Sequence, residues 1–524
     1  MLLTDTLKKA CKLFPHKEAV LCGSRRFTYE EFFTRLTGFA AWLRAAGVER
    51  GDRIAILHPN CHYFLEAYYA LAWIGAVSVP LNHRLAAREL AFILQDAGAR
   101  ILIADPSFRP LVASLGGALP QVEKIVWTGE GGRGGPGEHR DVYYEDLLSG
   151  ASPGPSEALG EADIAQLYYT SGTTGRPKGV ILTHKNVTVH SLGAIAELNL
   201  TDRDVWLHAA PLFHLADAWA TWAMTWVGGT HVLVPEFAPP AVLAAMEREG
   251  VTLTNLIPTM LNMLINHPDV GKFDYSRLRV LLSGGAPIAP EVVRKIVATF
   301  KCDYIQTYGM TETSPYLTLS LLKEHLRRLT PEEQLRFKAK TGREFIAVEL
   351  KVLNDAGGEI RRDEREVGEI VVRGDTVTPG YWNLPEETAQ TFRDGWLATG
   401  DMACMDAEGY VTIVDRRKDM IITGGENVYS TEVEHVLYMH PAVLECAVVG
   451  VPDEKWGEAV QGIVVLKQGC AATAEELIAF CKERIARYKA PKAIDFLELL
   501  PKTGSGKIAK KQLRERYGPT NLGD

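Results

Sequence analysis

The sequence of 524 residues has few cysteines and no long apolar run, and these absences exclude several classes of protein. Its eight cysteines are scattered, without a C-x-x-C pair or a Cys/His cluster at zinc spacing, so neither a disulfide framework nor a zinc site is expected. No apolar stretch reaches the ~20 residues that span a bilayer. The net charge of −8 argues against a nucleic-acid-binding protein.

The N-terminus lacks the basic region and apolar core of a signal peptide, so we expect a cytoplasmic protein. Leu3, Leu7 and Ala10 fall at helical spacing and favour an amphipathic helix packed on the body. Peripheral membrane contact through this helix stays open, and so does a homodimer.

Two common nucleotide-binding motifs are also missing. The pattern of the Walker A loop fails because Gly175 is followed by Arg176 and Pro177. A formal G-x-G-x-x-G occurs at residues 129–134, but it continues into Gly135-Pro136-Gly137 and opens no helix. Without a helix N-terminus to bind a pyrophosphate, this segment is predicted to be a solvent-exposed loop.

The chain is long enough for two to four domains, and its 46% hydrophobic and 23% charged residues are typical of globular proteins. Strand-like apolar runs alternate with helical patterns over the first ~400 residues, which indicates an α/β fold. The expected strands include Arg53–Leu57, Ile101–Ala104 and Tyr410–Val414. The sequence becomes polar at Asp415, and a smaller α+β unit follows, with a helix opened by a capping box at Thr431-x-x-Glu434 and a later strand at Asp495–Leu499. We therefore predict a large N-terminal domain, residues 1–414, and a small C-terminal domain, residues 415–524, joined by a hinge at Asp415.

The segment 168–179 is the most informative one. It contains three glycines, four hydroxyl side chains and the cations Arg176 and Lys178, with no apolar residue after Tyr169. Glycines let backbone N–H groups converge on an anion, and hydroxyls and cations add to that cradle, so a polyphosphate-binding loop is predicted. A flexible surface turn is the alternative. The predicted ligands are Thr170, Ser171, Gly172, Thr173, Thr174, Gly175 and Lys178.

Two further segments follow predicted strands. Gly284-Gly285-Ala286-Pro287 has the small residues that let a flat nucleobase approach the backbone, although an ordinary strand-to-helix turn fits equally well. Gln306-Thr307-Tyr308-Gly309 leads into Thr311 and Glu312, an oxygen-rich turn. Glu312 beside a phosphate loop could hold Mg²⁺, which takes oxygen ligands and shares them with phosphates.

Three charged residues complete the set of candidates. Asp401, in Thr399-Gly400-Asp401, is placed to accept hydrogen bonds from a ribose, and Arg416 could reach the ribose or the α-phosphate. Lys507 lies in a Gly/Ser-rich loop, where a long mobile cation suits insertion into another domain's site. The alternative for each is a solvated surface residue, which lysines usually are.

In these motifs the chain resembles the adenylate-forming superfamily, which contains acyl-CoA synthetases, firefly luciferase and the adenylation domains of peptide synthetases. The resemblance covers essentially the full chain. Its carriers are Tyr169–Gly179, Tyr308–Thr313, Thr399–Asp401, Asp415–Asp419, Gly424-Gly425-Glu426-Asn427 and Pro501–Lys507. One departure is Leu397, where the family usually has an aromatic residue.

The resemblance implies a role for each motif. ATP phosphates would bind at 168–179, adenine at Gly284–Pro287 and Gln306–Gly309, and Mg²⁺ at Glu312 with Thr170. Thr311 would lie at the α-phosphate, Asp401 and Arg416 at the ribose, and Lys507 would be the adenylation lysine. Lys418 would belong to the cofactor-binding set, and Gly424 and Gly425 would line the tunnel for coenzyme A.

The implied chemistry is activation of a carboxylic acid by ATP and Mg²⁺, followed by transfer to the thiol of coenzyme A. Because the two steps need different geometries, the small domain would rotate about the hinge. The presence of Lys507 and Glu312 argues against an inactive binding protein. A carrier-linked adenylation module would usually continue into a carrier domain, whereas 17 residues follow Lys507, so we do not expect one. A luciferase-like enzyme remains an alternative.

The identity of the acid rests on weaker signals. His214 should border the acyl pocket, and it argues against an amino-acid substrate, for which the family carries an aspartate nearby. After it, Trp219, Trp222, Met224 and Trp226 could line an alkyl channel or form ordinary helix core. The stretch Leu317–Lys340 resembles an insertion of fatty-acyl-CoA synthetases. We favour a medium- or long-chain fatty acid, with an aryl or other small carboxylate as the alternative.

Overall fold

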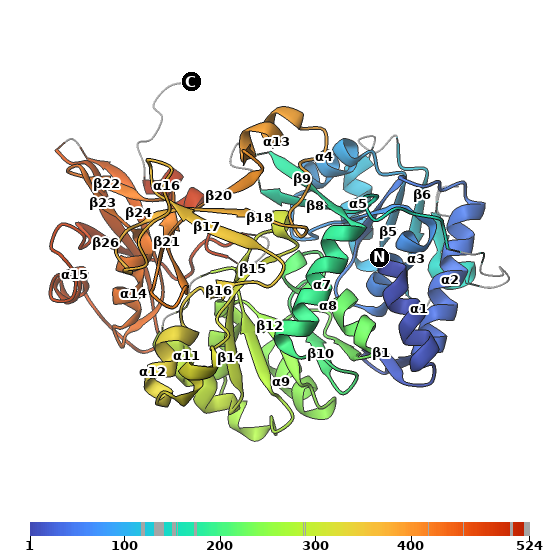
Figure 1. The fold of residues 1–524 in the computed structure, drawn as a ribbon, viewed down its shortest axis with the longest axis horizontal. Coiled ribbons are helices and arrows are strands. Elements are labelled where there is room, and N and C mark those ends of the chain that lie inside the picture. Colours follow the sequence, from blue (N-terminus) through green and yellow to red (C-terminus); the bar gives the residue numbers. More distant parts are fainter. Residues whose placement is uncertain are drawn as a thin grey trace.

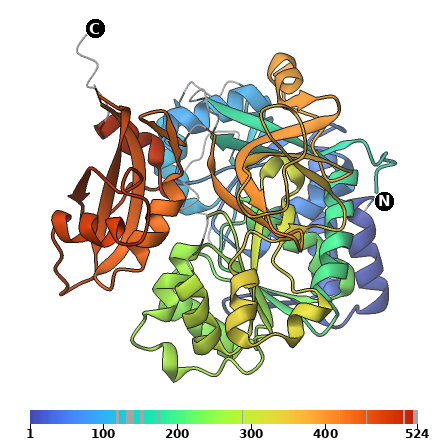
Figure 2. The same ribbon diagram turned by 60° about the vertical axis from the view of Figure 1, so that its left-hand side comes forward.

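A computed structural model gives the fold (Figure 1). It describes residues 1–116, 121–129, 141–148, 154, 156–171, 176–286, 288, 290–417, 419–453, 455–503 and 507–517. In these ranges the strands form four sheets, and helices pack against them. A smaller unit lies beside a larger one (Figures 1 and 2). This arrangement confirms the predicted α/β class with a large N-terminal and a smaller C-terminal lobe.

The first sheet runs in the order β7-β6-β5-β3-β4-β8-β9. Its strands are Asp141–Tyr143, Lys124–Trp127, Ile101–Ala104, Arg53–Leu57, Val77–Pro80, Ile164–Ser171 and Pro177–Thr183. All neighbours are parallel except β8 and β9, which form an antiparallel pair. The near-continuous apolar runs of β3 and β5 suit a parallel sheet covered on both faces.

The second sheet runs in the order β16-β15-β14-β13-β12-β10-β11-β1-β2. Its strands are Arg343–Glu344, Tyr316–Leu319, Asp303–Gly309, Val280–Ser283, Leu253–Leu256, Val205–His208, Thr230–Leu233, Glu18–Cys22 and Arg25–Thr28. The strands from β14 to β1 are parallel. Their carboxyl ends therefore meet at one edge, where an open α/β sheet binds its ligands.

The helices of the large lobe cover these two sheets. They are α1 Leu3–Leu13, α2 Tyr29–Ala45, α3 His62–Ile74, α4 Ala87–Ala97, α5 Arg109–Leu115, α6 Tyr144–Leu147, α7 His184–Leu198, α8 Leu215–Val227, α9 Pro239–Arg248, α10 Pro258–Ile265, α11 Pro290–Phe300, α12 Pro331–Lys338 and α13 Pro385–Thr391. Leu3, Leu7 and Ala10 of α1 are buried in the core with α2 and α3, so the N-terminal helix is packed, as predicted. Within the described ranges, no helix is both long and apolar enough to cross a membrane.

The third sheet is antiparallel and leads to the small lobe. It contains β17 Glu349–Leu353, β18 Gly368–Arg373, β20 Trp396–Met405 and β19 Phe392–Arg393, with β21 Val411–Arg416 paired to β20. Asp415 and Arg416 were expected to follow a strand that ends at Val414, but they belong to β21. The predicted hinge therefore begins inside a strand of the large lobe.

The small lobe contains the fourth sheet. Its strands are β22 Ile421–Thr423, β23 Glu426–Val428, β24 Val443–Asp453, β25 Gly457–Leu466 and β26 Ala493–Phe496, and its helices are α14 Ser430–Tyr438, α15 Ala474–Lys482 and α16 Lys510–Tyr517. Asp495–Leu499 was expected to be a strand, but β26 ends at Phe496, and Leu499 is exposed.

The stretch Leu317–Lys340 belongs to the large lobe. It contains a 3-10 helix, Glu324–Arg328, and α12, whose Leu335 is buried in the core that includes α11.

Candidate active site

Lys507 of the small lobe lies inside a site of the large lobe. A Cβ atom added at Gly285 would lie 2.8 Å from Cε and 3.5 Å from Nζ of Lys507. Gly285 also has a φ of +86°, so glycine serves here both the backbone conformation and the passage of the lysine. The pKa of Lys507 is lowered to about 8, chiefly by burial and then by Arg416, while Asp401 and Glu312 act in the opposite direction. The fold thus brings together four predicted site residues that are far apart in the sequence.

The loop that carries Lys507 is held at both ends. The backbone N–H of Thr503 donates to the Lys507 carbonyl at 2.7 Å, and the Lys507 N–H donates to Oγ1 of Thr503 at 3.2 Å. Lys502 and Ile508 form a β-bridge across the loop. Residues 504–506 lie outside the described part of the chain. These contacts fix where the lysine leaves the small lobe.

Asp401 and Arg416 face each other across β20 and β21. Their positions are paired in the strand register, and Nε of Arg416 lies 3.0 Å from Oδ1 of Asp401. The hydroxyl of Tyr308 donates to Oδ2 of Asp401 at 2.7 Å. Burial, and next Asp401, raise the pKa of Tyr308, so the phenol keeps its proton. The Asp401 carboxylate is therefore fixed in orientation, with lone pairs left to accept hydrogen bonds from a ribose.

The two predicted adenine-binding segments meet because β13 and β14 are parallel neighbours, with Ser283 opposite Gln306. Nε2 of Gln306 donates to the Ala286 carbonyl at 3.0 Å, and Oγ1 of Thr307 donates to the Ser283 carbonyl at 3.1 Å. A Cβ atom at Gly284 would lie 2.3 Å from Oγ1 of Thr307, so only glycine permits this approach. Gly309 is also confined, because a Cβ atom there would lie 1.8 Å from the Pro315 carbonyl oxygen. Pro287 lies outside the described residues.

Glu312 lies in a 3-10 turn, Thr311–Thr313, directly after β14. Its side chain is buried, and the hydroxyl of Tyr381 donates to its Oε1 at 2.9 Å. Burial raises the pKa of Glu312, whereas Tyr381, Arg416 and Lys178 lower it. A carboxylate with one oxygen still available suits a Mg²⁺ ion that takes its other ligands from phosphates. No group of three or more His, Cys, Asp or Glu side chains that could enclose a metal occurs among the described residues.

The structure describes only the two ends of the predicted phosphate loop, and phosphate binding there stays a prediction. Thr170 and Lys178 are opposite each other in the β8–β9 pair, and Ser171 is opposite Pro177, so these residues belong to strands. Lys178 forms an ion pair with Glu387 and lies 5.4 Å from the centre of the Tyr381 ring. Gly172, Thr173, Thr174 and Gly175, together with the Ser171 side chain and Lys418, lie outside what the structure describes.

Gly424 and Gly425 are not brought to Lys507. They form the turn between β22 and β23, at the outer end of the small lobe in Figure 1. The Gly424 N–H donates to the Trp456 carbonyl at 2.7 Å, and a Cβ atom at Gly424 would lie 2.9 Å from the Trp456 ring. The arrangement therefore brings together the predicted adenylation residues and leaves the predicted coenzyme A residues apart.

His214 is the N-cap residue of α8. Its Nδ1 accepts a hydrogen bond from the Ala216 N–H at 3.1 Å, which fixes the tautomer with the proton on Nε2. Burial, and next Lys507, lower the pKa of His214 to about 3, so the imidazole is neutral. A neutral ring beside Lys507 can donate through Nε2 to a carboxylate but carries no charge of its own.

Of the four candidate channel residues after His214, Trp219, Trp222 and Met224 are core residues, whereas Trp226 is half-buried. Trp219 packs against Trp206, and Trp222 packs against Tyr68 and Tyr69. Trp219, Trp222 and Met224 all have 0% exposure, so no water-sized space touches them. This favours the helix-core interpretation, and an alkyl chain along α8 would have to displace packed side chains.

Asp415 connects the two lobes. Its backbone belongs to β21, opposite Met402 of the large lobe, while its Oδ2 accepts a hydrogen bond from the N–H of Ser430, the first residue of α14, at 2.6 Å. A capping box opened by Thr431 is the sequence expectation for this helix, but α14 begins one residue earlier, and its N-terminus is satisfied by Asp415. The position of Asp415 is compatible with a pivot; the hinge itself stays a prediction.

Sequence reasoning missed Tyr381 and Glu387. Tyr381 follows Thr378-Pro379-Gly380, and the Thr378 N–H donates to the Glu312 carbonyl at 2.7 Å, which ties this turn to the metal-site candidate. A Pro-Gly turn followed by Tyr-Trp was a usable signal, because exposed turns rarely carry two large aromatic residues.

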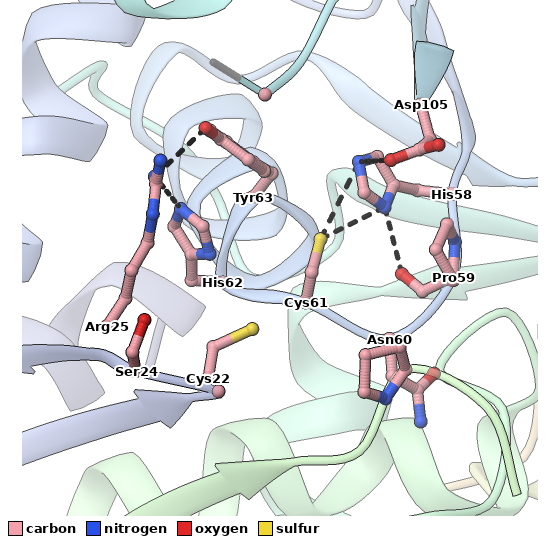
Figure 3. A pocket seen from close by; sticks show the side chains of 13 residues that line it. Cys22, Ser24, Arg25, His58, Pro59, Asn60, Cys61, His62, Tyr63 and Asp105 are labelled. Carbon is pink, nitrogen blue, oxygen red and sulfur yellow. Dashed lines mark hydrogen bonds and ion pairs between the residues drawn. The ribbon is translucent and has the colours of Figure 1, made fainter. Parts of the chain in front are cut away.

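A cavity of about 410 Å³ lies elsewhere, at the N-terminus of α3 (Figure 3). His58 Nδ1 is 3.0 Å from the Cys61 sulfur, and Nε2 is 3.5 Å from Oδ2 of Asp105. Burial raises the pKa of Cys61 well above its usual range and lowers that of His58 to about 4. A protonated thiol beside a weakly basic imidazole is a poor nucleophile, so this row of Cys, His and Asp has no nucleophilic role.

Comparison with known proteins identifies the family. The model of the AMP-binding enzyme family matches residues 7–382, and that of the AMP-binding enzyme C-terminal domain matches residues 432–507. The chain belongs to the AMP-binding enzyme family. It is 40% identical to feruloyl-CoA synthase from Amycolatopsis sp over 97% of this chain and 98% of that protein. It is 36% identical to the long-chain-fatty-acid–CoA ligase FadD13 of Mycobacterium tuberculosis over 94% of each chain.

Solved structures of the family agree with the fold. The ATP-bound crystal structure of MatB from Rhodopseudomonas palustris superposes with a TM-score of 0.87, 31% sequence identity and 99% coverage of both chains. The relatives named above are acyl-CoA synthetases, and this chain is an enzyme of that kind. Acyl-CoA synthetases use ATP and coenzyme A, and the two relatives above are named for a feruloyl and a long-chain fatty acyl product.

Proposed function

We propose that this acyl-CoA synthetase joins a carboxylic acid to coenzyme A through an acyl-adenylate, with Lys507 acting in the first step only. The observation that carries the proposal is the position of Lys507, buried against Gly285 and within electrostatic reach of Asp401, Glu312, Arg416 and His214. A lysine donated by one lobe to a charged site in the other has no role in stabilising either lobe alone. Its burial is explained by a reaction that needs a positive charge there.

In the first half-reaction a carboxylate oxygen of the acid attacks the α-phosphorus of ATP, and pyrophosphate leaves. Two anions approach each other, so fixed positive charge must offset the developing repulsion. Lys507 and Arg416 supply that charge, and the neutral Nε2–H of His214 can orient the acid. Asp401, held by Tyr308 and Arg416, would receive the ribose, while Ala286 and Gln306 would border the base.

Mg²⁺ would be held by Glu312, with the Thr170 hydroxyl nearby in the predicted site, and it would supply further neutralisation of the phosphates. The polyphosphate would contact the segment 170–175 and Lys178. Tyr381 keeps the Glu312 carboxylate oriented by its hydrogen bond to Oε1.

In the second half-reaction the thiol sulfur of coenzyme A attacks the acyl carbon, and AMP leaves. We propose that the small lobe, residues 415–524, rotates about Asp415 for this step, removing Lys507 and bringing Gly424 and Gly425 to the site. The conformation described above would then be the adenylating one, because Lys507 is inside and the two glycines are outside.

For the acid we propose a medium- or long-chain fatty acid, supported by the 36% identity to a long-chain-fatty-acid–CoA ligase. An aryl acid is the second candidate. It is favoured by the 40% identity to a feruloyl-CoA synthase and by the complete burial of Trp219 and Trp222, which leaves a compact site.

A panel of acids tests both proposals. Purified enzyme is assayed with ATP, Mg²⁺ and coenzyme A on acetate, butyrate, octanoate, palmitate, benzoate, cinnamate and 4-hydroxycinnamate, with pyrophosphate release and thioester formation measured separately. A ligase gives both products in equal amounts with at least one acid. Hydrolysis of ATP to ADP, or no acid-dependent pyrophosphate at all, would contradict the proposed function.

A further inference from the structure

Asn255 is a buried polar residue on a largely apolar face of the second sheet. It is the third residue of β12, and its neighbours on the same face, Leu253 and Leu282, belong to the core formed with Trp219 of α8 and with Tyr316. Asn255 itself is only 4% exposed. An amide costs free energy when it is buried unless its polar atoms are hydrogen-bonded, so its presence on this face needs an explanation.

The amide nitrogen of Asn255 has a hydrogen-bond partner. Nδ2 of Asn255 donates to the carbonyl of Ala216 at 2.5 Å, and Nε1 of Trp219 donates to the same carbonyl at 3.1 Å. Two side-chain donors thus converge on the Ala216 oxygen. Turning the amide over would place Oδ1 against this oxygen, acceptor against acceptor, so the orientation is fixed with Nδ2 toward Ala216.

The amide oxygen of Asn255 differs from the nitrogen in this respect. Oδ1 of Asn255 is buried and has no hydrogen-bond partner among the described residues. The atom that fixes the amide, the Ala216 oxygen, belongs to the residue whose N–H is bound by His214. Asn255 is also one register step before Ser283, which opens the Gly284–Ala286 segment beside Lys507. The neighbours of Asn255 thus lead to the site from the side where α8 begins: Ala216 contacts His214, and the strand beside Asn255 continues into Gly284.

We propose that Asn255 is a specificity-determining residue, and that its Oδ1 accepts a hydrogen bond from a hydroxyl group carried by the acyl part of the acid. This inference rests on the proposed function and narrows its substrate to hydroxylated acids, whether alkyl or aryl. A plain hydrocarbon at this position would leave the acceptor buried and unpaired. A site built to hydrogen-bond a hydroxyl rejects the analogue that lacks it for that reason.

The test compares matched acids that differ by one hydroxyl. The kcat/KM of acid-dependent pyrophosphate release is measured for 4-hydroxycinnamate against cinnamate, 4-hydroxybutyrate against butyrate and 8-hydroxyoctanoate against octanoate. For the pair that the enzyme uses best, we expect the hydroxylated acid to be preferred by about tenfold or more, the effect of one hydrogen bond to a buried group. In Asn255→Leu the preference should fall to about twofold or less, mainly through loss of activity on the hydroxylated acid.

A control variant separates specificity from folding. Thr221→Val removes another buried hydroxyl without a partner among the described residues, on α8 itself, and should leave the preference at its wild-type value. Asn255→Leu should still activate the unhydroxylated acid within about threefold of wild type, which shows that fold and chemistry are intact. Asn255→Ala gives a second reading if the leucine is too bulky.

Two outcomes overturn the inference. Equal use of both acids of each pair by wild type would mean that Oδ1 is satisfied by water, with the proposed ligase function left standing. An unchanged preference in both Asn255 variants would assign the hydroxyl to another residue. If no acid supports pyrophosphate release, the proposed function itself fails, and the inference with it.

Discussion

Adenylation by this enzyme should decline as the pH rises through about 8, because Lys507 then loses its proton. An exposed lysine titrates near pH ~10.4, so it would stay charged over the whole range in which enzymes are usually assayed. Burial and the nearby Arg416 lower the pKa of Lys507 to about 8 in the free enzyme. The lowered value places the loss of charge inside the accessible range.

The sign and size of the effect follow from this value. Below pH 8 the ammonium is present and the first half-reaction proceeds; above pH 8 the charged fraction falls about tenfold for each further pH unit. The kcat/KM for acid-dependent ATP–pyrophosphate exchange should therefore be nearly flat to about pH 7 and fall by roughly fifteenfold between pH 8 and pH 9.5. In kcat the descending limb should move to higher pH, since bound phosphates favour the ammonium.

The assay needs a variant of Lys507 and a matched lysine. Lys507→Ala should reduce exchange by roughly 10²–10³-fold and remove the descending limb. Lys502 is the control, because it lies in the same loop but forms an ion pair with Glu445 at 2.8 Å, away from the site. Lys502→Ala should keep both the rate and the limb. Both variants should form thioester from supplied acyl-AMP at the wild-type rate, because Lys507 acts only in the first half-reaction.

The reasoning would be refuted by a wild-type exchange rate that stays flat to pH 9.5, or by a Lys507→Ala enzyme that shows the same descending limb. The first result would mean that Lys507 keeps a normal pKa or does not act. The second would assign the limb to another group. Equal loss of both half-reactions in Lys507→Ala would indicate a folding defect instead of a catalytic one.

Three more predictions test other parts of the site. Glu312→Gln should raise the Mg²⁺ concentration needed for half-maximal pyrophosphate release by at least tenfold without lowering Tm, and an unchanged titration would remove Glu312 from the metal site. If a fatty acid is the substrate, Trp219→Ala should shift the preferred straight-chain acid to greater length, at a cost of about 3–5 kcal/mol in stability, and an unchanged length profile would contradict a chain path along α8. Asp415→Pro should retain pyrophosphate release but lose most thioester formation, because proline fixes φ at the proposed pivot. The control Asp415→Ala also loses the hydrogen bond to Ser430 but should keep the wild-type ratio of the two activities. A wild-type ratio in the proline variant would place the pivot elsewhere.

Much of the architecture was predictable from the sequence, and its limits have physical causes. Strands β3 and β5 were predicted to the residue, because short apolar runs between helical patterns are a local signal. The start of α14 was wrong by one residue, because Asp415, 15 residues earlier, satisfies its first N–H, and no local pattern reveals a long-range cap. β26 was misplaced because Leu497 and Leu499 continue an apolar run that the fold leaves without a strand partner beyond Phe496 in the described chain.

The site shows the same division. Lys507, Glu312, Asp401 and Arg416 were named from motifs, and the structure brings them together. Tyr381 was missed because its role depends on one hydrogen bond to Glu312, 69 residues away. The aromatic stripe on α8 was ambiguous, since helical spacing is the same for a core and for a channel lining. Only the packing of Trp219 and Trp222 against residues of other elements shows that they are buried.

The sequence by itself determined the reaction chemistry, because charged and glycine-rich motifs keep their residue types wherever the chain places them. Tertiary structure alone decided which of these motifs meet at one time. Lys507 lies beside Asp401 and Glu312 while Gly424 and Gly425 lie elsewhere, an arrangement of the two lobes that no local pattern encodes. It also decided that the side-chain oxygen Oδ1 of Asn255 is buried without a hydrogen-bond partner among the described residues. Burial and hydrogen bonding are properties of the packed chain and not of its individual residues.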